Sequence, residues 1–239
     1  VIIVLNLQLA AQTSCSNADF EASSAGQITS SNQITGWIVE NGVNQFPNNS
    51  CNLGGCCPNA PSKSNLISAI ATGYIDPVIG AQYPLFSVFG TSINNGFGYN
   101  AQLGINSMCG VNFLRLNDQI SGDYSIEKAS KKIKITSDNS ILRYAFVYVG
   151  YGSHPCCDGN LFQVGLTNIT TNSILTSFSS TVYPPSTFSC STDTSTVFYI
   201  AGSNAVYTST NMAQIAYNKW RIMNLDLSPY LGDSIKIDF

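Results

Sequence analysis

The residues with the richest chemistry stand together in residues 152–160, which read GSHPCCDGN. This stretch contains His154, the chain's single histidine, followed by the adjacent cysteines Cys156 and Cys157. Such a cluster can be a zinc site, a redox-active or nucleophilic pair, or a covalent staple made of disulfides. The compartment in which the chain folds and the spacing of the ligands distinguish these alternatives.

The cysteines favour a disulfide framework. The chain has eight of them: Cys15, Cys51, Cys56, Cys57, Cys109, Cys156, Cys157 and Cys190. An even number of cysteines behind an export signal is typical of disulfide bonding in an oxidising compartment. Adjacent cysteines rarely bond to each other, because the peptide between them strains the bridge. We therefore expect each adjacent pair to hold its loop to two other segments, while the connectivity stays open.

The export signal is the N-terminal stretch VIIVLNLQLAAQTSC. Its apolar run ends in small residues, is too short to cross a bilayer, and fits the end of a secretory signal peptide. The alternative is a first β-strand rich in Val, Ile and Leu. We expect residues 1–12 to be the remnant of a signal peptide, which places the chain outside the cell or on its surface. No other segment approaches transmembrane length, so we do not expect an integral membrane protein.

Catalytic and metal-bound roles for His154 find little support. The sequence contains no HExxH, GxSxG, GxGxxG or P-loop motif. A thiolate beside His154 would be consumed by disulfide formation, and adjacent cysteines seldom both reach one tetrahedral zinc ion. Glycosidase-type carboxylate pairs depend on geometry, but Asp and Glu together number only 13. We expect no catalytic residues, no resident cofactor and no enzymatic activity.

Composition indicates a fold of strands joined by polar loops. Hydrophobic residues make up 44% of the 239 residues, which is enough for a core, whereas charged residues make up only 10%. Ser, Thr, Asn and Gly are abundant in place of charged residues. Such a composition is rich in turn formers and β-branched residues. The net charge of −3 lacks the basic footprint that nucleic-acid binding requires.

Alternation of apolar and polar residues identifies individual strands. Residues 132–136 (KIKIT) and 234–239 (SIKIDF) alternate cleanly, which predicts strands with one solvated face. Residues 141–149 (ILRYAFVYV) are apolar on both faces apart from one arginine, which predicts a central strand. Helical periodicity is confined to residues 65–71 and 124–129, each long enough for a turn or two. We expect an all-β, antiparallel β-sandwich of the jelly-roll kind, stapled by disulfides, with residues 13–239 forming one domain.

The sequence offers candidate residues for a sugar-binding site and for a structural calcium site. Trp37 and Trp220 offer rings on which a sugar can stack, although each begins an apolar strand, where tryptophan usually packs into the core or at an edge. Glu21 and Asp238 lie near the two ends of the chain and are candidates for a structural calcium ion where the first and last strands of a jelly roll meet. The alternative for these acids is a solvated surface role.

Several stretches in consistent order resemble one family. The opening Cys15-Ser16-Asn17-Ala18-Asp19-Phe20-Glu21, followed by Thr35-Gly36-Trp37, resembles the pattern C-x-N-x-x-F-E … G-W. Further matches are a Cys-Cys-Pro loop at 56–58, FLRLN at 113–117 (which lacks the family's glycine), ILRYAFV at 141–147, His154-Pro155, and WRIMNLDLSPYLG at 220–232. These features are similar to an N-terminal β-sandwich domain of Bacteroidetes gliding-motility-associated, adhesin-like surface proteins exported by type IX secretion.

The resemblance implies an extracellular module of a long surface protein, with no catalytic residues to carry over. The pair Cys156-Cys157 is not part of the family pattern, so the resemblance implies nothing about the role of these two cysteines. Family members continue with one more cysteine-containing strand, which implies that one or two strands are missing beyond Phe239. We therefore expect a non-enzymatic adhesion or binding module whose ligand is a surface glycan or a protein. The alternatives are a carbohydrate-binding module attached to a secreted hydrolase and a purely structural spacer.

Overall fold

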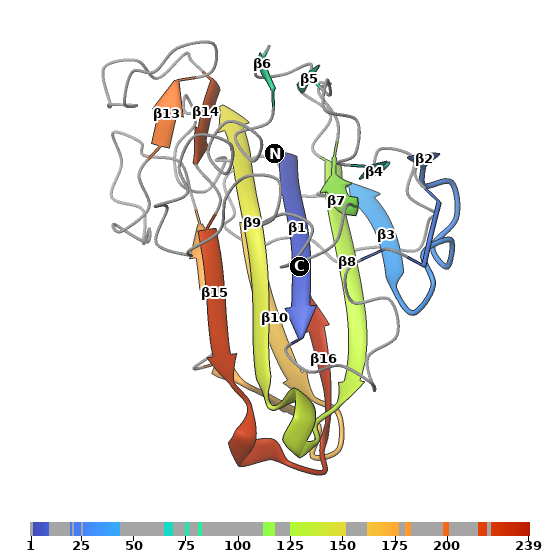
Figure 1. The fold of residues 1–239 in the computed structure, drawn as a ribbon, viewed down its shortest axis with the longest axis vertical. Helices are drawn as coiled ribbons and strands as arrows, with labels where there is room; N and C mark the ends of the chain where they lie inside the picture. The colour runs from blue at the N-terminus through green and yellow to red at the C-terminus, as the bar shows by residue number, and fades with distance from the viewer. Residues whose placement is uncertain are drawn as a thin grey trace.

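Strands dominate the part of the chain that the structure, a computed structural model, describes. The described residues are 2–9, 20, 22–24, 26–43, 65–68, 75–76, 81–82, 112–117, 125–151, 162–176, 180–182, 198–200, 215–218 and 221–239. Their strands pair antiparallel throughout, in an eight-stranded, a six-stranded and a two-stranded sheet (Figure 1). The mostly β, antiparallel class expected from the sequence is confirmed.

The six-stranded sheet has the order β11-β10-β16-β8-β3, with β12 pairing the other part of β10. Its strands are β3 (Ile38–Val43), β8 (Ser125–Lys134), β10 (Phe162–Asn168), β11 (Ser173–Ile174), β12 (Ser180–Val182) and β16 (Ser234–Asp238). The predicted alternation is confirmed here. Ile133 and Ile135 are buried whereas Lys132 and Lys134 are exposed, and β16 buries Ile235 and Ile237. One face of this sheet therefore belongs to the core and the other faces solvent.

The eight-stranded sheet has the order β13-β14-β9-β1-β7-β4-β2, with β15 also pairing β9. Its strands are β1 (Ile2–Leu9), β2 (Gly26–Gln27), β4 (Asn65–Ser68), β7 (Asn112–Leu116), β9 (Ile141–Tyr151), β13 (Phe198–Ile200), β14 (Ile215–Asn218) and β15 (Arg221–Asp226). The short strands β5 (Ile75–Asp76) and β6 (Ala81–Gln82) pair with each other. β9 is the central strand that the sequence predicted, because it has paired neighbours on both sides.

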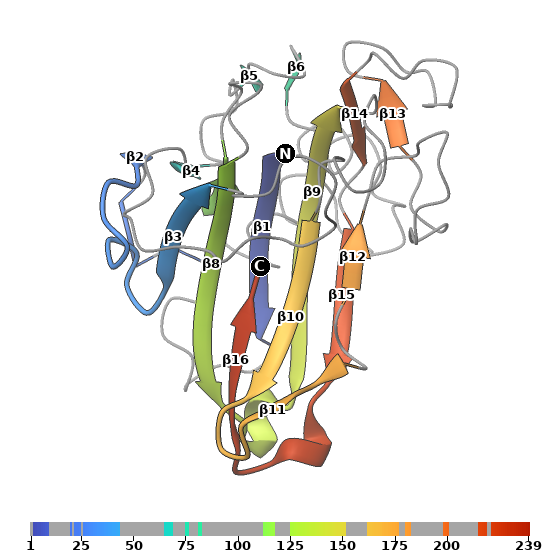
Figure 2. The same ribbon diagram turned by 180° about the vertical axis from the view of Figure 1, so that it is seen from behind.

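The core forms where the two larger sheets contact each other. Leu142, Tyr144, Phe146 and Tyr148 of β9 are each at most 1% exposed. The ring of Phe146 lies 4.7 Å from that of Phe162 in β10. Figure 2 shows β10 and β16 in front, on the opposite side of the molecule from β9 and β1, which are in front in Figure 1. Aromatic rings therefore fill the space between strands of the two sheets.

The described residues contain no α-helix, and their helical structure is of the 3-10 kind, as in the turns η1 (Ser137–Asn139) and η4 (Ser228–Tyr230). Asn139 closes the first turn: its Oδ1 accepts the Thr136 N–H at 2.7 Å and its Nδ2 donates to the Lys134 carbonyl at 2.9 Å. The helical turns predicted in residues 65–71 and 124–129 were wrong for the described parts, which are the strand β4 and the start of β8. Pairing with β7 and β3 overrides that weak local pattern. The described part contains no helix with the length and apolar character needed to span a membrane.

The N-terminal segment is strand β1, paired along its whole length with β9. This is the alternative that the sequence left open beside a signal peptide. The assignment of residues 1–12 to a signal peptide concerns processing of the chain and stays a prediction.

Candidate binding face

Trp37 lies in the core, just before β3. Its side chain is only 2% exposed, and its ring centroid is 4.8 Å from that of Phe20 and 6.1 Å from that of Phe239. The Lys131 ammonium lies 5.1 Å from the indole centroid and also donates to the Gly36 carbonyl at 3.3 Å. A solvent-borne sugar cannot stack on a ring in this position. Trp37 therefore has the packing role that was the alternative to ligand binding.

Most of the other predicted site residues lie outside the described residues. These are Trp220, Glu21, His154 and all eight cysteines, Cys15, Cys51, Cys56, Cys57, Cys109, Cys156, Cys157 and Cys190. Sugar stacking at Trp220 and the disulfide framework therefore stay predictions.

Asp238 lies on the solvent-facing side of β16, where its carboxylate is already bonded. Ser130 Oγ donates to Oδ1 at 2.5 Å, and Lys236 Nζ lies 2.8 Å from Oδ1 and 2.9 Å from Oδ2. The positive charge beside this carboxylate is thus the Lys236 ammonium. Across the described ranges, no three His, Cys, Asp or Glu residues gather into a group that would hold a metal ion. Calcium binding that involves Glu21 stays a prediction.

Strand pairing gathers lysines on the outer face of the six-stranded sheet. β8 carries Lys128, Lys132 and Lys134 at alternate positions, so their side chains share one face. β16 adds Lys236, whose register partner in β8 is Lys132. We call the surface formed by these four lysines, with Glu40, Ser130 and Asp238, the lysine face.

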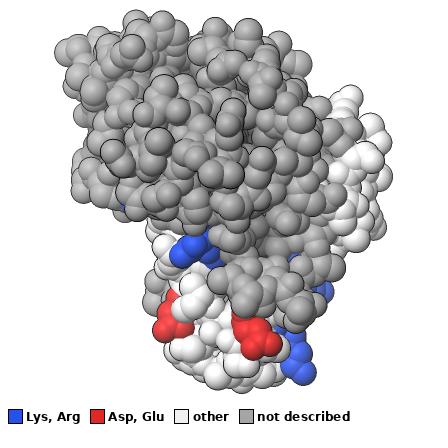
Figure 3. Space-filling view, in the orientation of Figure 1, with Lys and Arg blue, Asp and Glu red and all other residues white. Residues whose placement is uncertain are grey.

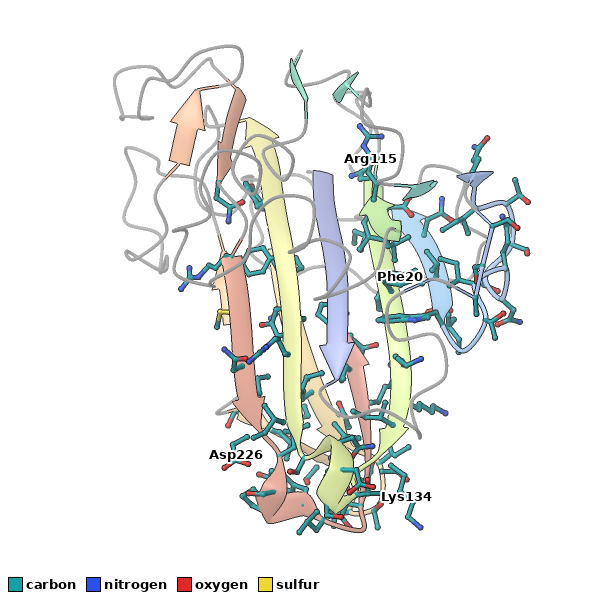
Figure 4. All side chains as sticks on the ribbon, viewed as in Figure 1. Phe20, Arg115, Lys134 and Asp226 are labelled. Carbon is teal, nitrogen blue, oxygen red and sulfur yellow. The ribbon has the colours of Figure 1, made fainter. Side chains whose placement is uncertain are left out.

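The charges on the lysine face are only partly compensated. Lys128 pairs with Glu40 of β3 at 3.1 Å, and Lys236 pairs with Asp238. Lys132 and Lys134 are exposed, and within the described part of the chain neither has an acidic partner. Figure 4 shows Lys134 pointing away from the molecule at the end of β8. Among the described residues, these two adjacent positions on one strand face therefore carry positive charge without an acidic partner.

Two small residues of β10 lie next to the lysines. Gly165 of β10 is the register partner of Asp238, and a Cβ placed there would meet no atom within 4 Å. Thr167 of β10 is the partner of Lys236.

Two polar residues of the eight-stranded sheet lie apart from the lysine face. Most of the face in Figure 3 belongs to residues that are not described, and the described charged side chains in view, of both signs, lie toward its lower end. On the outer face of the eight-stranded sheet, Arg143 Nε donates to Asn224 Oδ1 at 2.6 Å. Figure 4 places Asp226, at the end of β15, on the side of the molecule away from Lys134. Arg143 and Asp226 therefore lie outside the lysine face.

Sequence reasoning recognised the alternating strands but not the lysine face. The signal was present in KIKIT and SIKID, where lysines occupy the predicted solvent positions. What was missing was the pairing of β8 with β16, two strands about a hundred residues apart, which sets Lys236 beside Lys132. Comparisons with protein-family models, with curated proteins and with solved structures give no match.

Proposed function

We propose that this chain is a non-enzymatic, extracellular adhesion or binding module of a large bacterial cell-surface or secreted protein. Its fold is a disulfide-stapled β-sandwich of the jelly-roll kind, and its parent is a Bacteroidetes surface protein of the gliding-motility-associated class. The lysine face is its ligand-contacting surface. The observation that carries this assignment is the gathering of four lysines on one solvent-facing sheet surface in a chain whose net charge is −3.

An anionic surface glycan is the ligand that fits this face. Side chains two positions apart on a strand are separated by about 7 Å, and neighbouring strands by about 4.8 Å. Lys132 and Lys134, with the ion pair of Lys236 and Asp238 beside them, therefore form a compact group with net positive charge that can meet successive carboxylate or sulfate groups of a polysaccharide. Most of the attraction comes from exposed charges, so it weakens as salt screens them.

The test is binding of the chain to carboxylated and to sulfated polysaccharides, measured by calorimetry at low and at physiological salt. A lysine near an anionic surface contributes about 1 kcal/mol. The double variant Lys132→Glu, Lys134→Glu should therefore bind at least about tenfold more weakly. Both side chains are exposed, so we expect the variant's stability to change by no more than about 0.5 kcal/mol per substitution.

The matched control is Arg143→Glu, which reverses a charge on the outer face of the other sheet. It should leave binding within about twofold of the unmodified chain, since exposed charges beyond a Debye length are largely screened. Equal losses in the control and in the lysine variant, or no binding of any anionic polysaccharide, would contradict the assignment. Catalytic turnover that is lost on changing a carboxylate pair would contradict the non-enzymatic part.

A carbohydrate-binding module on a hydrolase is the second candidate. Sugar stacking needs exposed rings, and Trp37 is buried. That alternative therefore depends on Trp220. Binding of a neutral glycan that Trp220→Ala abolishes and the lysine variant retains would favour it, whereas a structural spacer would bind neither class of glycan.

A further inference from the structure

We propose that the anionic polysaccharide lies across the strands of the six-stranded sheet, with its acidic groups on Lys132 and Lys134 and the C–H faces of its sugar rings on Ile174 and Ile169. This inference rests on the proposed function of the lysine face and extends the contact surface to β11. It depends on strand register, on the exposure of the two isoleucines and on the hydrogen bonds that hold the turn between β10 and β11.

Strand register places a lysine and an isoleucine at the two ends of one row. Lys132 of β8 is the register partner of Lys236 in β16. Lys236 is in turn the partner of Thr167 in β10, and Thr167 is also the partner of Ile174 in β11. Register partners in antiparallel strands direct their side chains to the same face of the sheet. Figure 2 shows β8, β16 and β10 side by side in this sheet, so the row crosses the strands on the solvent-facing side.

A second row repeats this arrangement. Lys134 of β8 is the register partner of Ser234 in β16, and the N–H of Ile169 donates to the Ser234 carbonyl at 2.9 Å. This hydrogen bond continues the register between β10 and β16 by one residue. Neighbouring strands lie about 4.8 Å apart, so the strands of Lys134 and Ile169 are about 10 Å apart and those of Lys132 and Ile174 about 14 Å apart. The face therefore has a cationic side and an apolar side.

Both isoleucines are exposed although their neighbours pack into the core. Ile174 is 72% exposed, the most of any large apolar side chain in the described ranges, and Ile169 is 39% exposed. The adjacent residues Leu175 and Asn168 are 7% and 2% exposed, which fixes the isoleucines on the outer face. Their side chains add little to the core, and covering them with an apolar surface is favourable.

Hydrogen bonds hold the turn that carries the isoleucines. Asn168 Oδ1 accepts the N–H groups of Thr170 and Thr171 at 3.0 and 3.2 Å, and Asn168 Nδ2 donates to Asp233 Oδ2 at 2.7 Å. Thr170 Oγ1 accepts the Ser234 N–H at 2.9 Å. These bonds join the turn to the start of β16. A ligand therefore finds the apolar side already ordered and loses little affinity to ordering it.

The face specifies an anion that also has an apolar surface. Lys132 and Lys134 have no acidic partner within the described residues, and their charge complements carboxylates. Any polyanion can meet that requirement. A sugar ring adds C–H groups on its two faces, which can cover Ile174 and Ile169. The isoleucines therefore distinguish a carboxylated polysaccharide from a polyanion that has charge alone.

The experiment compares calorimetric binding of polygalacturonate, a carboxylated polysaccharide, with binding of inorganic polyphosphate at low salt. The variant Ile174→Ala, Ile169→Ala should bind polygalacturonate at least about fivefold more weakly, because it lacks apolar atoms that the sugar rings cover. Its affinity for polyphosphate should be unchanged, since the lysines are intact. Ile174→Val, which keeps most of the apolar surface, should keep most of the affinity for polygalacturonate. Lys132→Glu, Lys134→Glu should weaken binding of both polymers.

The matched control is Ile141→Ala. Ile141 is 42% exposed at the start of β9 in the other sheet, where its register partner is Asp226. The substitution removes the same atoms from a side chain of similar exposure, and both affinities should be unchanged. All of these side chains are exposed, so each variant should also keep the urea midpoint of the unmodified chain.

Four outcomes would overturn the inference. If the lysine variant loses polygalacturonate and the isoleucine variant does not, the proposed function stands and the position of the sugar rings is wrong. If the isoleucine variant loses both polymers equally, the isoleucines do not read the sugar. If the unmodified chain binds no polygalacturonate, this inference fails, and failure with every anionic polysaccharide removes the proposed function as well. If it binds vesicles of phosphatidylcholine with phosphatidylglycerol through Ile174 and does not bind polygalacturonate, the face contacts a lipid surface.

Discussion

Replacement of Trp37 by alanine is the sharpest test of how the core is built. The indole is 2% exposed and contacts two buried rings, Phe20 and Phe239, while Lys131 lies over its face. Truncating a buried tryptophan to alanine costs about 3–5 kcal/mol. Phe20 has a φ of 67°, a left-handed conformation that costs a non-glycine residue roughly 1–2 kcal/mol. Removing the ring that packs on Phe20 lets this strain relax, which offsets part of the loss and places the expected value towards the lower end of this range.

The loss is measured by urea denaturation followed by circular dichroism, so that the signal does not depend on the removed fluorophore. Protein domains typically have a free energy of unfolding of about 5–15 kcal/mol, so the variant should still fold and should unfold at a lower urea midpoint. Trp37→Phe should lose clearly less, because it keeps a ring against Phe20. The exposed residue Ile174, at 72%, supplies the control: Ile174→Ala should stay within about 0.5 kcal/mol. A loss below about 1 kcal/mol for Trp37→Ala would refute the core assignment.

Three further predictions concern strand packing and pH. A Cβ at Gly150 would lie 2.7 Å from Tyr148 Oη, so Gly150→Ala should lose about 1–3 kcal/mol. Gly165→Ala, whose Cβ meets nothing within 4 Å, should gain about 0.4–1 kcal/mol in the same denaturation assay, and a loss there would contradict the geometry. Hydrogen bonds from the hydroxyl and the backbone N–H of Ser228 hold the pKa of Asp226 below its usual value. A depressed folded pKa means that this carboxylate stabilises the fold above its unfolded pKa and loses that effect as pH falls through the folded pKa. An NMR titration of Asp226 should show the low pKa, and Ser228→Ala should raise it.

The alternation of residue types determined the class of this protein and much of its strand structure. Period-two burial is a local property, so KIKIT and SIKID identified strands with one solvated face correctly, and the run 141–149, apolar on both faces, identified the central strand β9. Composition likewise predicted a mostly β chain with few helices, because polar turn formers replace charged surface-helix residues.

Only the tertiary structure decided which strands are neighbours and what their pairing brings together. The sequence shows Lys132 and Lys236 as solvent positions of separate strands, and only the β8–β16 register sets them side by side. The burial of Trp37 depends on Phe20 and Phe239, which come from opposite ends of the described chain. The place of β1 between β7 and β9 also joins segments more than a hundred residues apart. Such pairings are stabilised by hydrogen bonds and packing between segments far apart in the chain. The local pattern of residue types does not show which distant strands will pair.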